Sequence, residues 1–167
     1  MNDISITAEK WAFNLAATPT FLSFTTPTKP DTILVARGGS DSIAECGEDD
    51  KPCRTVWTGQ NAGKGQGKDW ICLLVREEAE MGDGFWMRGN MGMTLSSESS
   101  TQRSRVVIGR SSCSSTEGIV SISEATIQVE SLNMILSSSE ECMSSGWVFV
   151  VDSEGNLEAN SIGLAGE

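Results

Sequence analysis

Histidine and tyrosine are both absent from the 167 residues of this chain. Histidine is the commonest general base and metal ligand in proteins, so its absence excludes Ser-His-Asp and Cys-His arrangements. Basic residues are also scarce: 12 lysines and arginines stand against 23 acidic residues, which gives a net charge of −11. Because this charge repels phosphate backbones and anionic lipids, we expect no nucleic-acid partner and no role at a membrane surface.

Long apolar runs are missing as well, and we expect no secretory signal. No stretch approaches the roughly 18 apolar residues that a membrane span needs, so we expect no membrane insertion. Residues 1–25 lack a basic start followed by an apolar core, which argues against a secretory signal. The composition, 38% hydrophobic and 21% charged, is typical of a globular chain, and the length predicts one domain.

A repeated pattern near the C-terminus carries the fold prediction. Residues 125–134 and 155–164 align at an offset of 30, and both shift phase at a serine, Ser131 or Ser161. Alternation of apolar and polar residues predicts a strand with one buried face, and the phase shift predicts a corner or bulge. A strand that turns a corner and recurs indicates stacked parallel coils. The aligned apolar pairs are Ile127 with Leu157, Val129 with Ala159, Leu132 with Ile162 and Met134 with Leu164.

A weaker alignment suggests the spacing of the coils. Met93–Ser97 can be laid over residues 134–138 at an offset of 41. That offset predicts two coils of about 20 residues each, with the strand Val106–Ile108 between them. The preceding methionines and Met93 itself are predicted to fill an irregular core rather than bind a ligand. They are Met81, Met87, Met91 and Met93.

The five cysteines include one pair that is close in the sequence. Cys46 and Cys53 flank six residues rich in turn formers. A disulfide across this loop would stabilise the fold by about 2–3 kcal/mol, whereas a reducing compartment would leave two thiols; both states remain open. A zinc site is disfavoured, because this ligand spacing is unusual and no histidine completes the set. An odd number of cysteines leaves at least one thiol unpaired within the chain.

The segment around these cysteines resembles a known family. A buried-type strand, Ile33–Val35, leads into Gly39-Ser40-Asp41, then Cys46-Gly47 and Pro52-Cys53-Arg54-Thr55-Val56. This order is similar to the opening segment of right-handed parallel β-helix (pectin-lyase-like) repeat proteins of protist and bacterial cell surfaces. Among these are large protist surface proteins and the polymorphic outer-membrane proteins of bacteria. The resemblance covers residues 33–56, extends loosely to Leu164, and implies a β-helix that begins at this segment.

Three central segments complete the pattern. Gly59–Asp69 approaches a phosphate-binding loop, but Asp69 stands where Ser or Thr should bind magnesium, so we predict a plain loop between coils. Trp70–Val75 is a continuous apolar run, which predicts a strand buried on both faces or one that begins a coil. Arg76–Glu80 is predicted to be a solvated charge run, either an exposed loop or one helical turn.

We therefore predict an all-β fold, a short right-handed parallel β-helix of roughly five or six coils, with a β-sandwich as the alternative. Residues 1–31 are predicted to be an N-terminal arm or linker, since their Pro-containing stretches favour extended chain. Residues 32–167 form the predicted β-helix domain. The repeat runs to the last residues, so the chain is expected to be a fragment of a longer solenoid, to continue its stack end to end through a partner, or to carry a cap that the sequence does not reveal.

Three hypotheses for function follow. The first is a non-catalytic surface or structural repeat protein, extracellular or on the cell surface, whose partners are glycans or other surface proteins; it has no catalytic, cofactor or metal residues. The second is a β-helix polysaccharide lyase or hydrolase, which needs neighbouring carboxylates and, in a lyase, calcium. The third is a carbohydrate-binding module with a tryptophan platform, although tryptophans at strand starts are more typically core anchors. The candidate carboxylates are Asp83, Asp152 and Glu158, and the candidate platforms are Trp57, Trp70, Trp86 and Trp147.

Overall fold

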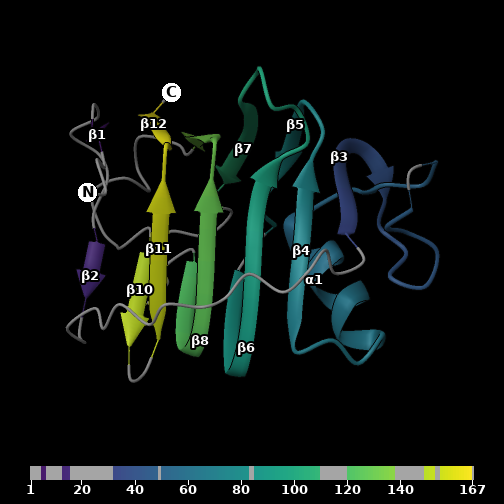
Figure 1. Ribbon diagram of the computed structural model, residues 1–167, viewed down its shortest axis with the longest axis horizontal. Coiled ribbons are helices and arrows are strands. Elements are labelled where there is room, and N and C mark those ends of the chain that lie inside the picture. The colour runs from purple at the N-terminus through teal and green to yellow at the C-terminus, as the bar shows by residue number, and fades with distance from the viewer. Residues whose placement is uncertain are drawn as a thin grey trace.

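The computed structural model describes residues 5–6, 13–15, 32–48, 50–82, 85–109, 120–137, 149–152 and 155–166. In these residues the fold is mostly β, with one helix, α1 (Val56–Gly65) (Figure 1). The strands are β1 (Ser5–Ile6), β2 (Phe13–Leu15), β3 (Thr32–Ser40), β4 (Trp70–Val75), β5 (Glu78–Glu80), β6 (Phe85–Ser97), β7 (Ser104–Gly109), β8 (Val120–Glu130), β9 (Leu132–Ser137), β10 (Phe149–Asp152), β11 (Asn156–Asn160) and β12 (Gly163–Gly166).

The strands form two sheets. The larger sheet has the order β2-β10-β8-β6-β4-β3, with β11 pairing with the second half of β8, and the smaller sheet has the order β1-β12-β9-β7-β5. From β4 to β10 the strands alternate between the two sheets, and β11 of the larger sheet leads to β12 of the smaller one. Every strand pair in the described part of the chain is parallel, and the antiparallel pairing of a β-sandwich is not found there.

The strand register confirms the repeat at an offset of 30. Leu157 lies beside Ile127 where β11 pairs with β8, and Leu164 lies beside Met134 where β12 pairs with β9. The alignment at an offset of 41 is wrong. Met93 of β6 pairs with Ile127, whereas Met134 pairs with Val106 of β7. Met93 and Met134 therefore lie in different sheets.

Left-handed backbone at single residues turns the chain from the larger sheet to the smaller one. Ser131 and Ser161, where the sequence predicts a corner, have φ angles of 54° and 55°. Glu77 occupies the equivalent position between β4 and β5, with a φ of 54°. Residues in this backbone region occur singly and not in runs. One such residue between two strands changes which face of the sheet the following side chains occupy. The corner explains why each passage shifts phase by one residue.

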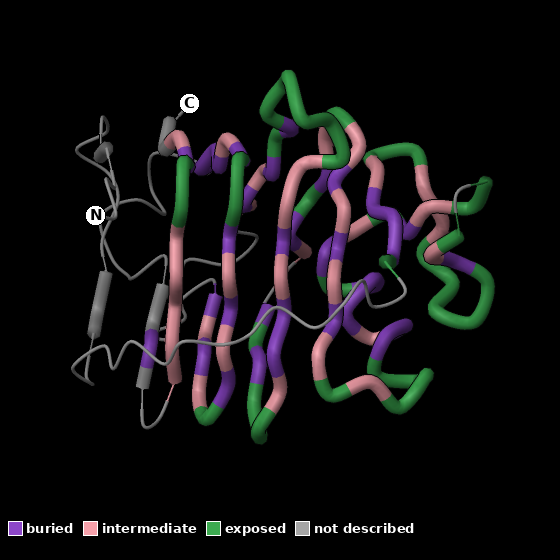
Figure 2. Tube along the Cα trace, in the orientation of Figure 1, coloured by how far each residue is buried: buried purple, intermediate pink, exposed green. Residues whose placement is uncertain are grey.

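Apolar side chains from both sheets form one hydrophobic cluster. The larger sheet contributes Ile71, Leu73 and Val75 from β4, each fully buried, while alternate residues of that strand are half-buried (Figure 2). Of the two alternatives predicted for this strand, burial on both faces is therefore wrong, because the strand covers the core with one face only. The smaller sheet contributes Leu132 and Met134 from β9. The predicted role of the methionines is confirmed, since Met81, Met87 and Met93 are buried and Met91 packs against the same cluster.

The helix α1 replaces the predicted loop over residues 59–65, and only residues 66–69 lie outside regular structure. Thr55 is its N-cap, and the Oγ1 atom of Thr55 accepts a hydrogen bond of 3.0 Å from the Thr58 N–H. Gly59 and Gly63 lie on the buried face, and their missing side chains let α1 approach Val35, Leu73 and Ile71 closely. Each glycine costs about 1 kcal/mol of helix propensity, so tertiary packing rather than local preference holds this helix.

Residues 76–80 and residues 1–31 both contribute strands to the sheets. Within residues 76–80, the predicted loop or helical turn is wrong for Glu78–Glu80, which is strand β5 with Ala79 fully buried, while Arg76 and Glu77 connect it to β4. Within residues 1–31, β1 and β2 pair in parallel with β12 and β10. The described part of the predicted arm therefore contributes the outermost strands at the edges that β12 and β10 would otherwise form.

Candidate functional site

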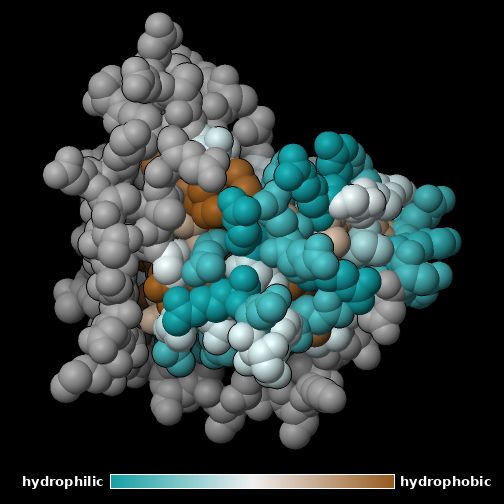
Figure 3. Space-filling model, turned by 90° about the horizontal axis from the view of Figure 1, so that it is seen from above, coloured by the Kyte–Doolittle hydropathy of each residue, from teal (hydrophilic) through white to brown (hydrophobic). Residues whose placement is uncertain are grey.

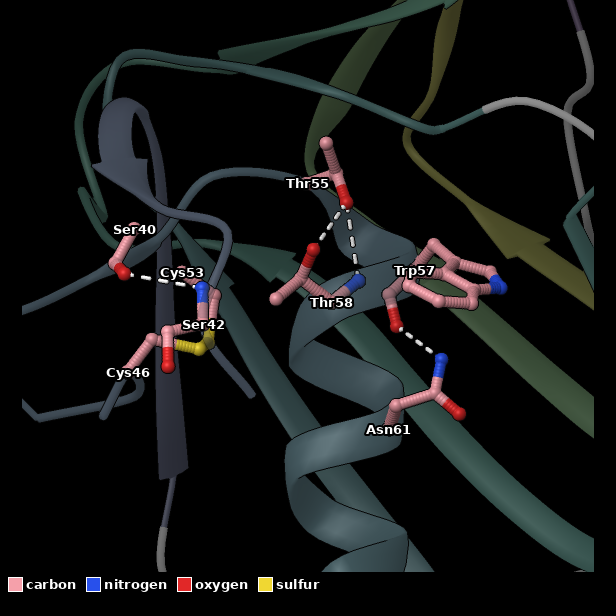
Figure 4. The surroundings of a disulfide bond; sticks show 8 residues. All are labelled: Ser40, Ser42, Cys46, Cys53, Thr55, Trp57, Thr58 and Asn61. Carbon is pink, nitrogen blue, oxygen red and sulfur yellow. Dashed lines mark hydrogen bonds between the residues drawn. A yellow bond between two sulfur atoms is a disulfide. The ribbon is translucent and has the colours of Figure 1, made fainter. Parts of the chain in front are cut away.

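A disulfide loop covers the β3 edge of the larger sheet. Cys46 and Cys53 are bonded, with their Cα atoms 4.8 Å apart, beside the N-terminus of α1 (Figure 4). The loop supplies backbone partners to β3: the Leu34 N–H donates to Gly47 O at 3.1 Å, and the Ser40 N–H donates to Pro52 O at 2.8 Å. An edge strand with satisfied backbone groups is protected from pairing with another chain. The loop therefore acts as a structural cap at this end of the sheet.

A polar ladder crosses the outer face of the larger sheet. It begins at Trp70 of β4, whose Nε1 donates to Thr94 Oγ1 of β6 at 3.0 Å. Thr94 Oγ1 donates in turn to Gln128 Oε1 of β8 at 3.3 Å, and Gln128 Nε2 donates to Glu158 Oε2 of β11 at 2.9 Å. Asn156 Nδ2 donates to the other oxygen of Glu158 at 3.0 Å. These polar groups satisfy one another across four strands, so the ladder stabilises the strand register and leaves few groups for a ligand.

A second outward strip, on the first half of β6, has the opposite character. Phe85 and Met87 point into the core, so Trp86 and Arg88 point outward, and the Trp86 side chain is 52% exposed. The guanidinium carbon Cζ of Arg88 lies 4.6 Å from the centroid of the Trp86 ring. Gly89 and Asn90 follow with positive φ angles of 77° and 46°, which turns the chain away beyond the strip. An exposed indole beside an arginine is the composition that binding surfaces favour.

The candidate tryptophans that the structure describes differ in how far their side chains are exposed. Trp57 on α1 is 40% exposed and Trp86 is 52% exposed, so the expectation that they are core anchors is wrong. Trp70 is half-buried, with its ring lying against Gly92, where any side chain would collide with it. Trp147 lies outside the described residues. Trp86 therefore offers the most accessible aromatic surface among the three tryptophans that the structure describes.

The candidate carboxylates are not brought together in the described part of the chain. Asp83 lies outside the described residues, and of Asp152 only the backbone is described, beside Ser123. Glu158 is engaged by Gln128 and Asn156 in the ladder. Among the described residues no group of three His, Cys, Asp or Glu side chains could hold a metal ion. The second hypothesis, a lyase or hydrolase, therefore gains no support from this arrangement.

Two of the other cysteines, Cys113 and Cys142, also lie outside the described residues, and Cys72 is a free thiol on the outer face of β4. Burial raises the pKa of the Cys72 thiol, although its hydrogen bond with Thr94 and the nearby charge of Lys68 act in the opposite direction. A raised pKa keeps the thiol protonated at neutral pH and therefore unreactive as a nucleophile. Cys72 is best understood as part of the half-buried face of β4.

A depression of about 830 Å³ lies between the disulfide loop and the C-terminal half of α1. Its lining includes Ile43 and Ala62 together with side chains of both charges, Glu45, Lys51 and Lys68. Charges of both signs and the absence of an aromatic ring from its lining favour no single class of ligand. The outward strip of β6 that carries Trp86 and Arg88, which we call the Trp86 strip, is therefore the better candidate for a binding site.

No family model, no curated protein and no solved structure matches this chain. Within the ranges that the structure describes, no helix combines the length and the apolar character needed to cross a membrane. The described surface is largely hydrophilic when the molecule is viewed from above (Figure 3). The Trp86 strip is therefore the surface from which we infer a function.

Proposed function

We propose that this chain is a right-handed parallel β-helix. Three observations support the proposal: the described strand pairs are parallel, the strands from β4 to β10 alternate between two sheets, and single residues with positive φ make equivalent corners at Glu77, Ser131 and Ser161. A chain that coils in this way presents aligned rows of side chains on its outer faces. Such a scaffold can hold a binding strip rigidly, because each strand is fixed by its neighbours on both sides.

The function that we propose is a non-catalytic surface protein of adhesive type that binds glycans through the Trp86 strip. The single observation that carries this proposal is the 52% exposure of Trp86 on a strand whose alternate residues are buried. A rigid strand holds the indole at low conformational cost, and a flat aromatic face suits the apolar face of a sugar ring. The first hypothesis, a surface protein, and the third, a carbohydrate-binding module, therefore share one site.

An extracellular or cell-surface location is part of the same proposal. The Cys46–Cys53 disulfide supports it, because disulfides persist in oxidising compartments and are rare where thiols are kept reduced. End-to-end self-association is a less favoured part of the proposal. The disulfide loop covers β3 at one end of the larger sheet, and β2 pairs with β10 at the other.

The experiment is a glycan array with the purified chain, followed by calorimetric titration of the glycans that bind. Trp86→Ala should weaken binding at least about tenfold, which corresponds to about 1.4 kcal/mol. Trp57→Ala is the matched control, because Trp57 is a 40% exposed tryptophan on α1 and not on β6. The free energy of unfolding of both variants should lie within about 0.5 kcal/mol of that of the parent.

Two results would count against the proposal. The first is that no glycan on the array binds the chain. The second is binding that Trp57→Ala weakens as much as Trp86→Ala does, since that would place the site elsewhere on the molecule. Circular dichroism of each variant separates lost binding from lost folding.

A further inference from the structure

The Trp86 strip contains a fixed positive charge. Arg88 lies two residues after Trp86 on β6, and its guanidinium is held over the indole at 4.6 Å from the ring centroid. This contact is electrostatic, because the face of the indole is negative. It orients the guanidinium at the surface instead of leaving it to sample many rotamers. A pre-oriented guanidinium loses less freedom when it binds a ligand.

Arg88 differs from most of the other described arginines in its surroundings. Arg37 and Arg105 contact Glu78, Arg54 contacts Asp41, and Arg76 contacts Glu98 through two hydrogen bonds. Arg88 forms no ion pair with any residue that the structure describes. Among the described residues, Arg88 therefore presents a positive charge that can pair with an anion from outside.

The neighbouring strand provides a floor of hydroxyl groups beside Trp86 and Arg88. In the register of β6 and β8, Trp86 lies beside Ser121 and Arg88 lies beside Ser123, and both serines are half-buried. A side chain on Gly89 would meet no atom within 4 Å, so the surface beyond Arg88 is open. The strip therefore combines an aromatic face, a guanidinium fork and two hydroxyls in an accessible position.

We propose that Trp86 and Arg88, with Ser121 and Ser123, form a subsite for a carboxylated sugar. This inference rests on the proposed glycan-binding function and adds the chemical class of the ligand. The indole face away from Arg88 stacks on the sugar ring, the guanidinium donates two hydrogen bonds to the carboxylate oxygens, and the serine hydroxyls reach the ring hydroxyls. Charge complementarity at Arg88 is the feature that distinguishes this ligand from a neutral sugar.

The acidic character of the chain sets a limit on the affinity. Glu124 is exposed immediately after Ser123, and the backbone of Asp152 lies beside Ser123 on the far side of β8. Repulsion from more distant carboxylates is screened beyond about 8 Å at physiological salt. Short oligosaccharides with few charges should therefore bind better than long polyanions.

The test compares two matched ligands by calorimetry: a hyaluronan oligosaccharide with its glucuronate carboxylates free, and the same oligosaccharide as its methyl ester. The parent chain should prefer the free acid at least about tenfold, and Arg88→Gln should bring the two affinities together. Trp86→Ala should weaken both ligands. Arg54→Gln is the matched control, because Arg54 is a half-exposed arginine on the disulfide loop, and it should behave as the parent does.

The possible outcomes separate this inference from the function on which it rests. Equal affinity for acid and ester, unchanged by Arg88→Gln, would overturn the carboxylate subsite and leave glycan binding at Trp86 intact. Stronger binding of a sulfated oligosaccharide than of the carboxylated one would also overturn it, because the subsite would then select sulfate. Failure of every glycan on the array to bind would overturn both proposals together.

Discussion

Two glycines on the same helix should respond to alanine with opposite signs. A Cβ atom on Gly63 would lie 2.8 Å from Cγ1 and 2.9 Å from Cγ2 of Ile71, which is fully buried. Overpacking of this kind costs about 1–3 kcal/mol, while the alanine gains about 1 kcal/mol of helix propensity. A Cβ atom on Gly65 would meet nothing within 4 Å, so only the gain remains. The two variants should therefore differ by about 1–3 kcal/mol in the free energy of unfolding.

The assay is urea denaturation of Gly63→Ala, Gly65→Ala and the parent, with the midpoint compared at a constant m-value. For a chain of this length each kcal/mol also moves Tm by about 2–4 °C, so thermal melts provide a second measure. Gly65→Ala should lie at or above the parent, and Gly63→Ala should lie at or below it. If both alanines changed stability equally, α1 would not pack against β4, and the reasoning about its glycines would be refuted.

The remaining predictions concern the cap, an ion pair and a corner. Replacing Cys46 and Cys53 by serine should lower the free energy of unfolding by about 2.5 kcal/mol, as the closure entropy of so short a loop requires, and a reductant that left the parent's urea midpoint unchanged would contradict this. Hydrogen bonds from Arg76 hold the pKa of Glu98 below its ordinary value, so their stabilisation is present at neutral pH and is lost as the pH falls through that lowered pKa. In an NMR titration, Arg76→Gln should move the Glu98 midpoint back upward, and an unmoved midpoint would argue against the pair. Ser131→Val should cost about 1–2 kcal/mol in chemical denaturation and Ser131→Gly should not, because Ser131 has a φ of 54°; equal effects would rule out a left-handed corner.

The sequence predicts the strand register wherever two passages preserve the same alternation. Ile127 and Leu157 can be aligned because both strands bury every second residue and both turn at a serine. The alignment of Met93 with Met134 fails because it compares strands of different sheets. β6 reaches β7 through residues 98–103, whereas a single corner residue, Ser131, joins β8 to β9. An apolar match without a corner therefore does not fix the register.

The helix and the site were harder to predict for physical reasons. Gly59 and Gly63 lower the helix propensity of residues 56–65, and the contacts that make them favourable come from β3 and β4, which lie far away in the sequence. Trp86 looks like a core residue by composition. A signal was nevertheless available, because Trp86 shares its strand face with Arg88, and a charged residue without a buried partner has to face solvent. The carboxylates that contact four of the other arginines lie elsewhere in the sequence, so the residues next to each arginine do not indicate its partner.

The parallel pairing of the strands can be tested by NMR contacts between backbone amides across β6, β8 and β11. We expect residue numbers to rise together along paired strands, with Thr94 beside Gln128 and Ser96 beside Glu130 on one side of β8. On the other side we expect Gln128 beside Glu158. Contacts in which residue numbers rise on one strand and fall on its neighbour would show antiparallel pairing and contradict the parallel arrangement.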